Sequence, residues 1–161
     1  MHNWKELFDY SDGFLFRTEK YFELYPATRR HADVGWCNNQ GYVQTEIDGV
    51  AFMLHRIIWE WHHGPIPAGM HIDHIDKNGL NNKIENLRLA TQSQNRANSK
   101  MNKNNTSGHK DTVRTPNGKF QARGTENGKK LYLGLFDTVE EASECYKAWA
   151  RKKHGDFVSF D

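Results

Sequence analysis

The stretch "HIDHIDKNGLNNKIENLRLATQSQNRAN", residues 71–98, decides how the fold of this chain is interpreted. It holds two His, two Asp and six Asn residues, with few apolar residues between them. The sequence predicts a short strand over "MHIDHI", a polar loop over "DKNGLNNKIEN" and a second short strand over "LRLA". Thr91 is expected to cap a helix through "QSQNRAN", so the run predicts a strand, a loop, a strand and a helix.

These short polar side chains suit a particular chemistry. Asp73 and the Asn residues offer carboxylate and amide oxygens, which hard divalent cations prefer. His74 offers an imidazole, the side chain best suited to act as a general base near neutral pH. Neighbouring residues of a strand point to opposite faces, so Asp73 and His74 can serve one site only if the strand ends there. The polar loop that follows favours such an ending.

Residues 55–98, beginning with "HRIIWEWHHGPIP", resemble the HNH endonuclease family in its phage and intron-homing branch. The resemblance implies a ββα-metal core in which Asp73 is a metal ligand and His74 is the general base that activates water. It also implies that Asn86 fixes the loop and so orients His74. By the same resemblance, Asn95, on the helix, would be the second metal ligand, at a position where some members of the family carry His and one branch carries Asn. Ligation by oxygen alone favours Mg²⁺, or Mn²⁺, over Zn²⁺.

The other polar residues of this region have plainer interpretations. A single Asn in such a loop is more often a turn former than a ligand, and this interpretation applies to Asn78, Asn81 and Asn82. His71 is assigned to packing or to the loop. His55 begins a helix, where it could touch phosphate or simply lie at the surface.

Patterns on either side predict further elements. "GYVQTEIDGVAFML" predicts a hairpin that turns at Asp48-Gly49, and "HRIIWEWHHG" predicts a helix that stops at Gly64. In the tail, "GKFQARGTENGKKLYLGLF" predicts two strands around a turn. The helix after them should begin with a capping box, Thr138 with Glu141, and end at Gly155.

Residues 107–157 resemble the APETALA-type, ethylene-response-factor DNA-binding domain, most clearly in "LGLFDT" and the helix after it. The resemblance implies three antiparallel strands placed in the major groove of DNA, with the helix behind them. Alternation should turn Phe120, Ala122, Leu131 and Leu133 toward the helix. The residues expected to contact DNA are Arg114, Lys119, Gln121, Arg123, Lys130 and Tyr132. The alternative is a solvated sheet face.

Charge is unevenly distributed along the chain. The net charge is only +2, yet residues 96–130 hold nine Lys or Arg residues against two acidic ones. Such a local basic stripe is typical of phosphate contact, although a solvated linker and loop face would have the same composition.

These observations predict an α+β protein in which a ββα-metal HNH nuclease core with an N-terminal β-hairpin region precedes a small three-stranded antiparallel sheet packed on one helix. The predicted domains are 1–98, with the motif core at 55–98, a linker at 99–107 and a DNA-binding domain at 108–161. The expected function is metal-dependent, site-directed cleavage of double-stranded DNA by a free-standing homing or nicking endonuclease of a phage or mobile element. A non-catalytic DNA-binding regulator on the same scaffold, or a nuclease that acts on RNA, is the alternative.

The expected setting is the cytoplasm of a host cell, with the protein as a monomer. No apolar run approaches the ~20 residues that a membrane span needs, and the N-terminus is no signal peptide. Cys37 and Cys145 are far apart and belong to no CxxC pair, so two free thiols are expected.

Overall fold

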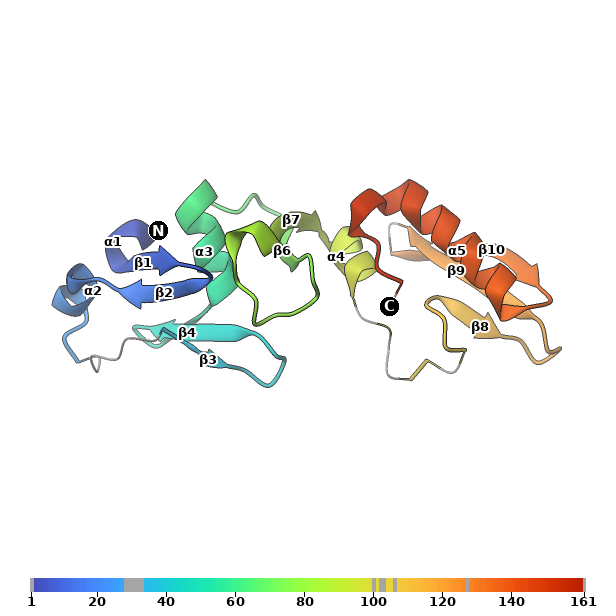
Figure 1. Ribbon diagram of the computed structural model, residues 1–161, viewed down its shortest axis with the longest axis horizontal. Coiled ribbons are helices and arrows are strands. Elements are labelled where there is room, and N and C mark those ends of the chain that lie inside the picture. The colour runs from blue at the N-terminus through green and yellow to red at the C-terminus, as the bar shows by residue number, and fades with distance from the viewer. Residues whose placement is uncertain are drawn as a thin grey trace. The chain divides into compact units, whose positions relative to one another are not determined.

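The computed structural model describes residues 2–27, 34–99, 101, 104–105, 107–126 and 128–160 (Figure 1). The chain forms two compact units, Met1–Ala90 and Thr91–Asp161, and each has its own hydrophobic core. Several small antiparallel sheets and helices make up a mixed α+β protein, as the sequence predicts. The boundary between the two units falls before helix 92–98, whereas the sequence assigns that helix to the nuclease domain. Part of the predicted linker, residues 100, 102, 103 and 106, lies outside the described residues.

The first unit is built from short elements joined by tight turns. In chain order these are α1 (Trp4–Leu7), β1 (Phe8–Ser11), β2 (Phe14–Arg17), α2 (Glu19–Leu24), β3 (Trp36–Cys37), β4 (Val43–Ile47), β5 (Val50–Met53), α3 (Leu54–His63), β6 (Met70–His74), the 3₁₀ turn η1 (Ile84–Asn86) and β7 (Leu87–Thr91). The strands pair as β1–β2, β3–β4–β5 and β6–β7.

The predicted hairpin is the pair β4–β5. Asp48 and Gly49 both have positive φ, 51° and 75°, which suits the tight two-residue turn of a hairpin. Thr45 and Ile47 point inward and are buried, because side chains alternate between the faces of a strand. The chain then enters α3, which buries Ile57 and ends at Gly64 with φ of 81°.

One cluster of buried side chains holds the first unit together. Burial of apolar surface is the main driving force for such a cluster, at about 25 cal/mol per Å². Trp61 lies beside it and donates from Nε1 to the carbonyl of Phe8 at 2.8 Å, which fixes α3 against β1. The buried members are Trp4, Leu7, Phe8, Leu15, Tyr21, Val34, Ile47, Leu54, Ile57, Ile58, Ile72 and Leu87. Ile72 and Leu87 belong to β6 and β7, so the core also fixes the two strands of the motif.

The second unit contains α4 (Gln92–Asn98), β8 (Thr112–Arg114), β9 (Phe120–Glu126), β10 (Lys129–Phe136), α5 (Val139–His154) and the 3₁₀ turn η2 (Gly155–Phe157). The strands form one antiparallel sheet in the order β10-β9-β8. This is the three-stranded sheet with one helix that the sequence predicts.

Helix α5 packs on this sheet through small residues. Ala122, Ala142 and Ala150 are fully buried. Trp149 lies against Gly124, where an added Cβ would stand 2.9 Å from its ring atoms. Thr138 and Glu141 form the predicted capping box at the start of α5.

Helix α4 is also capped as predicted, by Thr91 together with Gln94. Within the second unit, Ser159 donates from its backbone N to the carbonyl of Ala97 at 3.3 Å. The ammonium of Lys110 donates to the carbonyls of Ala97 and Ser99, each at 2.7 Å. These bonds occupy carbonyls that the end of a helix leaves without intrahelical partners.

No helix in the described part of the chain is long and apolar enough to cross a membrane. Cys37 and Cys145 are both free thiols, as expected.

Candidate active site

The site begins where β6 ends. Asp73 and His74 are the last two residues of this strand, and both are buried at 5% exposure. Directly after them the chain turns into the polar loop, whose two ends are joined by a bond from Ile75 N to the carbonyl of Asn86 at 2.9 Å. The strand therefore ends at the position that the sequence requires if Asp73 and His74 are to serve one site.

The loop between β6 and β7 is folded by its own amides around Asp76. One carboxylate oxygen of Asp76 accepts from Asn78 N at 2.8 Å and from Asn86 Nδ2 at 2.9 Å, and the other accepts from Asn81 Nδ2 at 2.7 Å. Asn86 also accepts from Asp76 N at 3.0 Å and donates to the carbonyl of Asn81 at 2.8 Å. Burial acts to raise the pKa of Asp76, but the bonds from Asn78, Asn81 and Asn86 lower it overall. The many Asn residues are therefore explained by their hydrogen bonds, which hold together a loop that has little apolar surface to bury.

This loop packs closely against residues 41–42, which precede β4. A Cβ added at Gly79 would stand 2.5 Å from the carbonyl oxygen of Gly41 and 2.7 Å from a ring carbon of Tyr42. Only glycine fits such a contact without displacing backbone. Tyr42, which contacts the loop, also packs near His74, with 5.8 Å between the two ring centroids.

Three side chains surround the His74 imidazole. Its Nε2 is 3.0 Å from Oδ1 of Asn82, which is itself buried at 3% exposure. His55 packs edge to face against it, with ring centroids 5.1 Å apart, and Tyr42 contacts both His rings. Asn82 thus bonds to Nε2 of the imidazole, and the rings of His55 and Tyr42 pack against it.

His55 is neutral in the folded protein. Burial, followed by the charges of His74 and Arg56, lowers the pKa of His55 to about 3. Its Nδ1 is buried and has no hydrogen-bond partner among the residues that the structure describes. The sequence offered a phosphate contact or a surface position for His55; the structure instead buries it against His74.

Asp73 carries the negative charge of the site. Its Oδ2 accepts from Nε of Arg88 on β7 at 2.9 Å, and the two side chains are 5% and 18% exposed. Within the described ranges, no group of three or more His, Cys, Asp or Glu side chains could hold a metal ion. A zinc centre usually needs such a set, whereas Mg²⁺ is often bound through one or two carboxylates with water. A hard cation at Asp73 therefore fits the donors that this region contains.

The sequence-predicted residues of the motif are divided between the two units. Asp73 and His74 lie side by side in the first unit with Asn86 at the loop base, whereas Asn95 lies on α4 in the second unit. The contact to His74 comes from Asn82, which the sequence analysis interpreted as a turn former. No local signal separates Asn82 from its neighbours, because only burial distinguishes them.

Comparison with known proteins identifies the family of the chain. Residues 52–97 match the family model described as HNH endonuclease. Protein 3.8 of Escherichia phage T7 is 38% identical over 107 residues, which cover 66% of this chain and 88% of that protein. The chain belongs to the HNH endonuclease family. It is accordingly a nuclease.

Two proteins named as HNH endonucleases are also similar to this chain, but the match covers a smaller part of each of them. An uncharacterised HNH endonuclease of Acanthamoeba polyphaga mimivirus, L560, is 35% identical over 107 residues. The match covers 66% of this chain but only 55% of the mimivirus protein. A Bacillus subtilis prophage protein, YosQ, assigned by name to the HNH homing endonucleases, is 34% identical over 55 residues, 34% of this chain and 32% of that protein. No solved structure matches the chain.

The HNH family model ends at residue 97 and does not extend to the tail, so the APETALA-type resemblance stays a prediction. The register of the sheet nevertheless shows which predicted DNA contacts share a face. Arg123 on β9 pairs with Tyr132 on β10, so their side chains share a face of the sheet. Ala122, the residue before Arg123, is buried under α5, so Arg123 and Tyr132 lie on the face opposite that helix. Gln121 accepts from Arg123 at 2.9 Å and 3.2 Å. Lys130 joins this face, and Tyr132 is 63% exposed.

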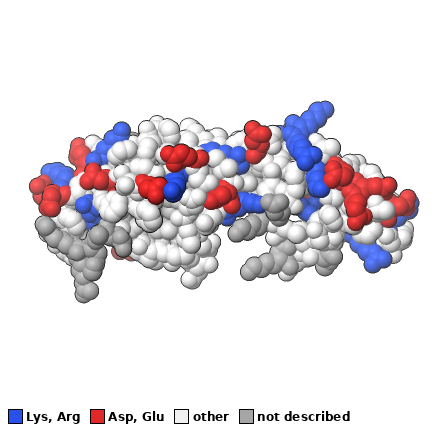
Figure 2. Space-filling view, in the orientation of Figure 1, with Lys and Arg blue, Asp and Glu red and all other residues white. Residues whose placement is uncertain are grey.

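One of the predicted contacts, Arg114, lies on the other face of the sheet. Arg114 pairs with Phe120, whose side chain packs in the core under α5, so Arg114 falls on the helix side of the sheet. Lys119 pairs with Asp137 at 2.9 Å, and this bond raises the pKa of Lys119. Basic and acidic side chains are interspersed over the face of the protein drawn in Figure 2.

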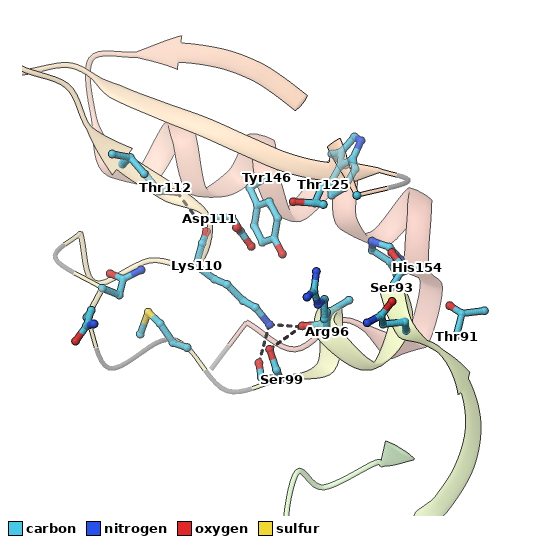
Figure 3. Close-up of a pocket in the computed structure, with 18 residues that line it drawn as sticks. Thr91, Ser93, Arg96, Ser99, Lys110, Asp111, Thr112, Thr125, Tyr146 and His154 are labelled. Atoms are coloured by element: carbon cyan, nitrogen blue, oxygen red, sulfur yellow. Dashed lines mark hydrogen bonds between the residues drawn. The ribbon is translucent and has the colours of Figure 1, made fainter. Parts of the chain in front are cut away.

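The second unit also contains a pocket of about 740 Å³ beside α4 (Figure 3). It is lined by residues of α4, of the segment before β8 and of α5, among them Arg96, Lys110, Tyr146 and His154. The ammonium of Lys110 reaches toward the end of α4 and bonds to the carbonyl of Ser99, as the dashed lines show. All of its lining residues belong to the second unit, so Asp73 and His74 are not among them.

Proposed function

We propose that the protein is a divalent-metal-dependent endonuclease that hydrolyses phosphodiester bonds of double-stranded DNA with His74 as its general base. The observation that supports this assignment is the buried pair Asp73–His74 at the end of β6, with the imidazole bonded to Asn82 at 3.0 Å. A buried imidazole held at one nitrogen and placed beside a carboxylate is the arrangement that activation of water requires.

The reaction follows from the roles of these groups. His74 takes a proton from a water molecule, and the water oxygen forms a bond to phosphorus. The bond from phosphorus to the 3′-oxygen breaks, and that oxygen leaves with a proton supplied by solvent. The chain ends as a 5′-phosphate and a 3′-hydroxyl, so one water is consumed for each bond broken.

Asp73 is the residue that would hold the cation, with Asn95 as the second ligand that the motif implies. The cation, Mg²⁺ or Mn²⁺, would offset the negative charge that develops on the phosphoryl and leaving oxygens. The oxygen-only donors support a hard cation, and the buried Asp73 carboxylate is a group of the first unit that could bind one.

The outer face of the β8–β10 sheet is the proposed DNA-reading surface. Gln121, Arg123 and Tyr132 lie together there, and Gln and Arg side chains can bond to the edges of A and G bases. Lys130 on the same face suits phosphate contact. A nuclease core combined with this DNA-reading surface suits a homing or nicking enzyme of a phage or mobile element. One copy of Asp73 and His74 serves one phosphodiester, so a monomer would nick one strand first.

Cleavage of supercoiled plasmid tests the assignment directly. The wild type should convert it first to open circles when Mg²⁺ is present and should be inactive in EDTA. His74→Ala should abolish cleavage while binding to duplex DNA, measured by gel shift, stays within a few-fold. His71→Ala is the matched control, because His71 lies on the same strand but is exposed, and it should cleave at the wild-type rate.

Two outcomes would contradict the proposal. A His74→Ala protein that cleaves like wild type would show that another group is the base. Tight DNA binding without any cleavage by the wild type would favour a non-catalytic DNA-binding regulator instead, and preference for RNA in a competition assay would change the substrate class.

A further inference from the structure

Asn82 differs from the other Asn residues of the loop because its amide is buried and faces the proposed base. Its Nδ2 donates to the carbonyl of Leu80 at 3.4 Å, and its Oδ1 lies 3.0 Å from Nε2 of His74. A backbone carbonyl can only accept, so the amide nitrogen must face Leu80 and the amide oxygen must face the imidazole. The oxygen in turn can only accept, which places the proton of the neutral imidazole on Nε2.

We infer that Asn82 is a positioning residue of this nuclease, which fixes His74 as the Nε2–H tautomer so that Nδ1 is the nitrogen that accepts the proton of water. This inference rests on the proposed role of His74. A neutral imidazole has one N–H and one basic nitrogen, so the bond at Nε2 decides where the basic nitrogen is.

The loop and the β1–β2 hairpin hold Asn82 in place. A Cβ at Gly13, in the hairpin turn, would stand 3.2 Å from the backbone carbon of Asn82, so the two backbones are in close contact. The hydroxyl of Tyr10 accepts from Ile84 N at 3.0 Å, and Lys83 forms an ion pair with Asp12 at 2.7 Å. The backbone that directly follows Asn82 is therefore anchored on the β1–β2 hairpin.

The neighbours of His74 support the same role. His55 and Tyr42 pack against its ring and limit its rotation. Asn86, predicted to orient His74, bonds to Asp76 and Asn81 and so closes the loop. The division of roles is then clear: Asn86 shapes the loop, and Asn82 holds the imidazole.

The expected effect is on turnover rather than on DNA binding. Asn82→Leu keeps the branched shape and the number of side-chain heavy atoms but removes the acceptor, so kcat should fall roughly 10- to 100-fold, as expected for a misplaced catalytic group, with KM for DNA little changed. Asn82→Asp keeps an oxygen at the same place and should recover most of the rate. Asn78→Ala is the control, because Asn78 is an exposed Asn of the same loop and its variant should cleave like wild type.

A spectroscopic measurement separates positioning from mere folding. Nitrogen NMR of ¹⁵N-histidine-labelled protein, without DNA or metal and at one alkaline pH, should show His74 as the Nε2–H tautomer in the wild type and in Asn82→Asp. Asn82→Leu should show a mixture of tautomers. If Asn82→Leu does not fold, as judged by tryptophan fluorescence, Asn82→Ala replaces it in both assays.

The possible failures are distinguishable. An unchanged tautomer in the Leu or Ala variant, or a loss confined to KM, would overturn the role of Asn82. A wild-type protein that shows the Nε2–H tautomer but cleaves no DNA would refute the proposed function while leaving the Asn82–His74 bond confirmed.

Discussion

Replacing Arg88 with methionine would remove the guanidinium that faces the Asp73 carboxylate while keeping most of the side-chain volume. The two groups are 2.9 Å apart, and the Asp73 side chain is only 5% exposed. A carboxylate with so little contact with water depends on a positive partner. The first unit of Arg88→Met should therefore unfold more easily than that of the wild type.

The size of the loss follows from the burial of the pair. Removing one partner of a buried ion pair costs about 3 to 5 kcal/mol. Arg88 is 18% exposed, so water can replace part of its interaction, and the expected loss lies at the lower end, about 3 kcal/mol. If Asp73 binds a cation, Mg²⁺ supplies positive charge at the same carboxylate. Millimolar Mg²⁺ should then stabilise Arg88→Met more than the wild type, because a ligand stabilises the state that binds it more tightly.

Urea unfolding in EDTA and in Mg²⁺, followed by tryptophan fluorescence, would measure both effects. Fluorescence reports mainly on the first unit, because it contains four of the five tryptophans, Trp4, Trp36, Trp59 and Trp61. Lys83→Met is the control: its ion pair with Asp12 is well exposed, so its unfolding midpoint should stay at the wild-type value.

Two results would refute this reasoning. A loss in EDTA below about 1 kcal/mol, the size typical of an exposed pair, would show that Asp73 does not depend on Arg88. Equal stabilisation of both proteins by Mg²⁺ would indicate that the cation does not bind at Asp73.

Two further predictions concern neighbours of the site, and a third concerns the core of the second unit. The pKa of His55 is lowered from 6.5 to about 3, so the free energy of unfolding should decrease as the pH falls from about 6.5 toward 3. In urea unfolding over that pH range, His55→Phe should lose less stability than the wild type. Parallel plots of unfolding free energy against pH for the two proteins would contradict this. Asn86→Ala removes three side-chain bonds, so hydrogen exchange at residues 76–82 should accelerate far more than in Asn78→Ala, and equal exchange would mean that the loop is held by other contacts. Gly124→Ala would place a Cβ 2.9 Å from the Trp149 ring and should destabilise the second unit by about 1 to 3 kcal/mol in thermal unfolding; an unchanged midpoint would show that α5 can shift.

The elements that the sequence predicted well are those set by neighbours along the chain. The hairpin turn at Asp48-Gly49 needs two residues with positive φ, and the capping boxes at Thr91 and Thr138 need a partner three residues later. Each of these signals is complete within a few residues, so no knowledge of the rest of the fold is needed to interpret it.

The proposed DNA-reading face of the tail was only partly predictable. Alternation along β9 placed Gln121 and Arg123 on one face, as the structure has them. Arg114 could not be assigned in this way, because its face depends on the register between β8 and β9. That register pairs it with Phe120 and turns it to the helix side.

The sequence by itself determined the family and the order of the elements in the motif, because the motif is contiguous. It also singled out Asp73 and His74, because their proposed chemistry depends on residue type. Only the tertiary structure decided which side chains surround them. Arg88 faces Asp73, Asn82 bonds to His74, and His55 packs against the same ring. These contacts join residues from β6, β7, the loop and α3, and a buried amide cannot be told from an exposed one until those elements pack together. The physical reason is that hydrogen bonding and burial are properties of neighbours in space, whereas the sequence shows only neighbours along the chain.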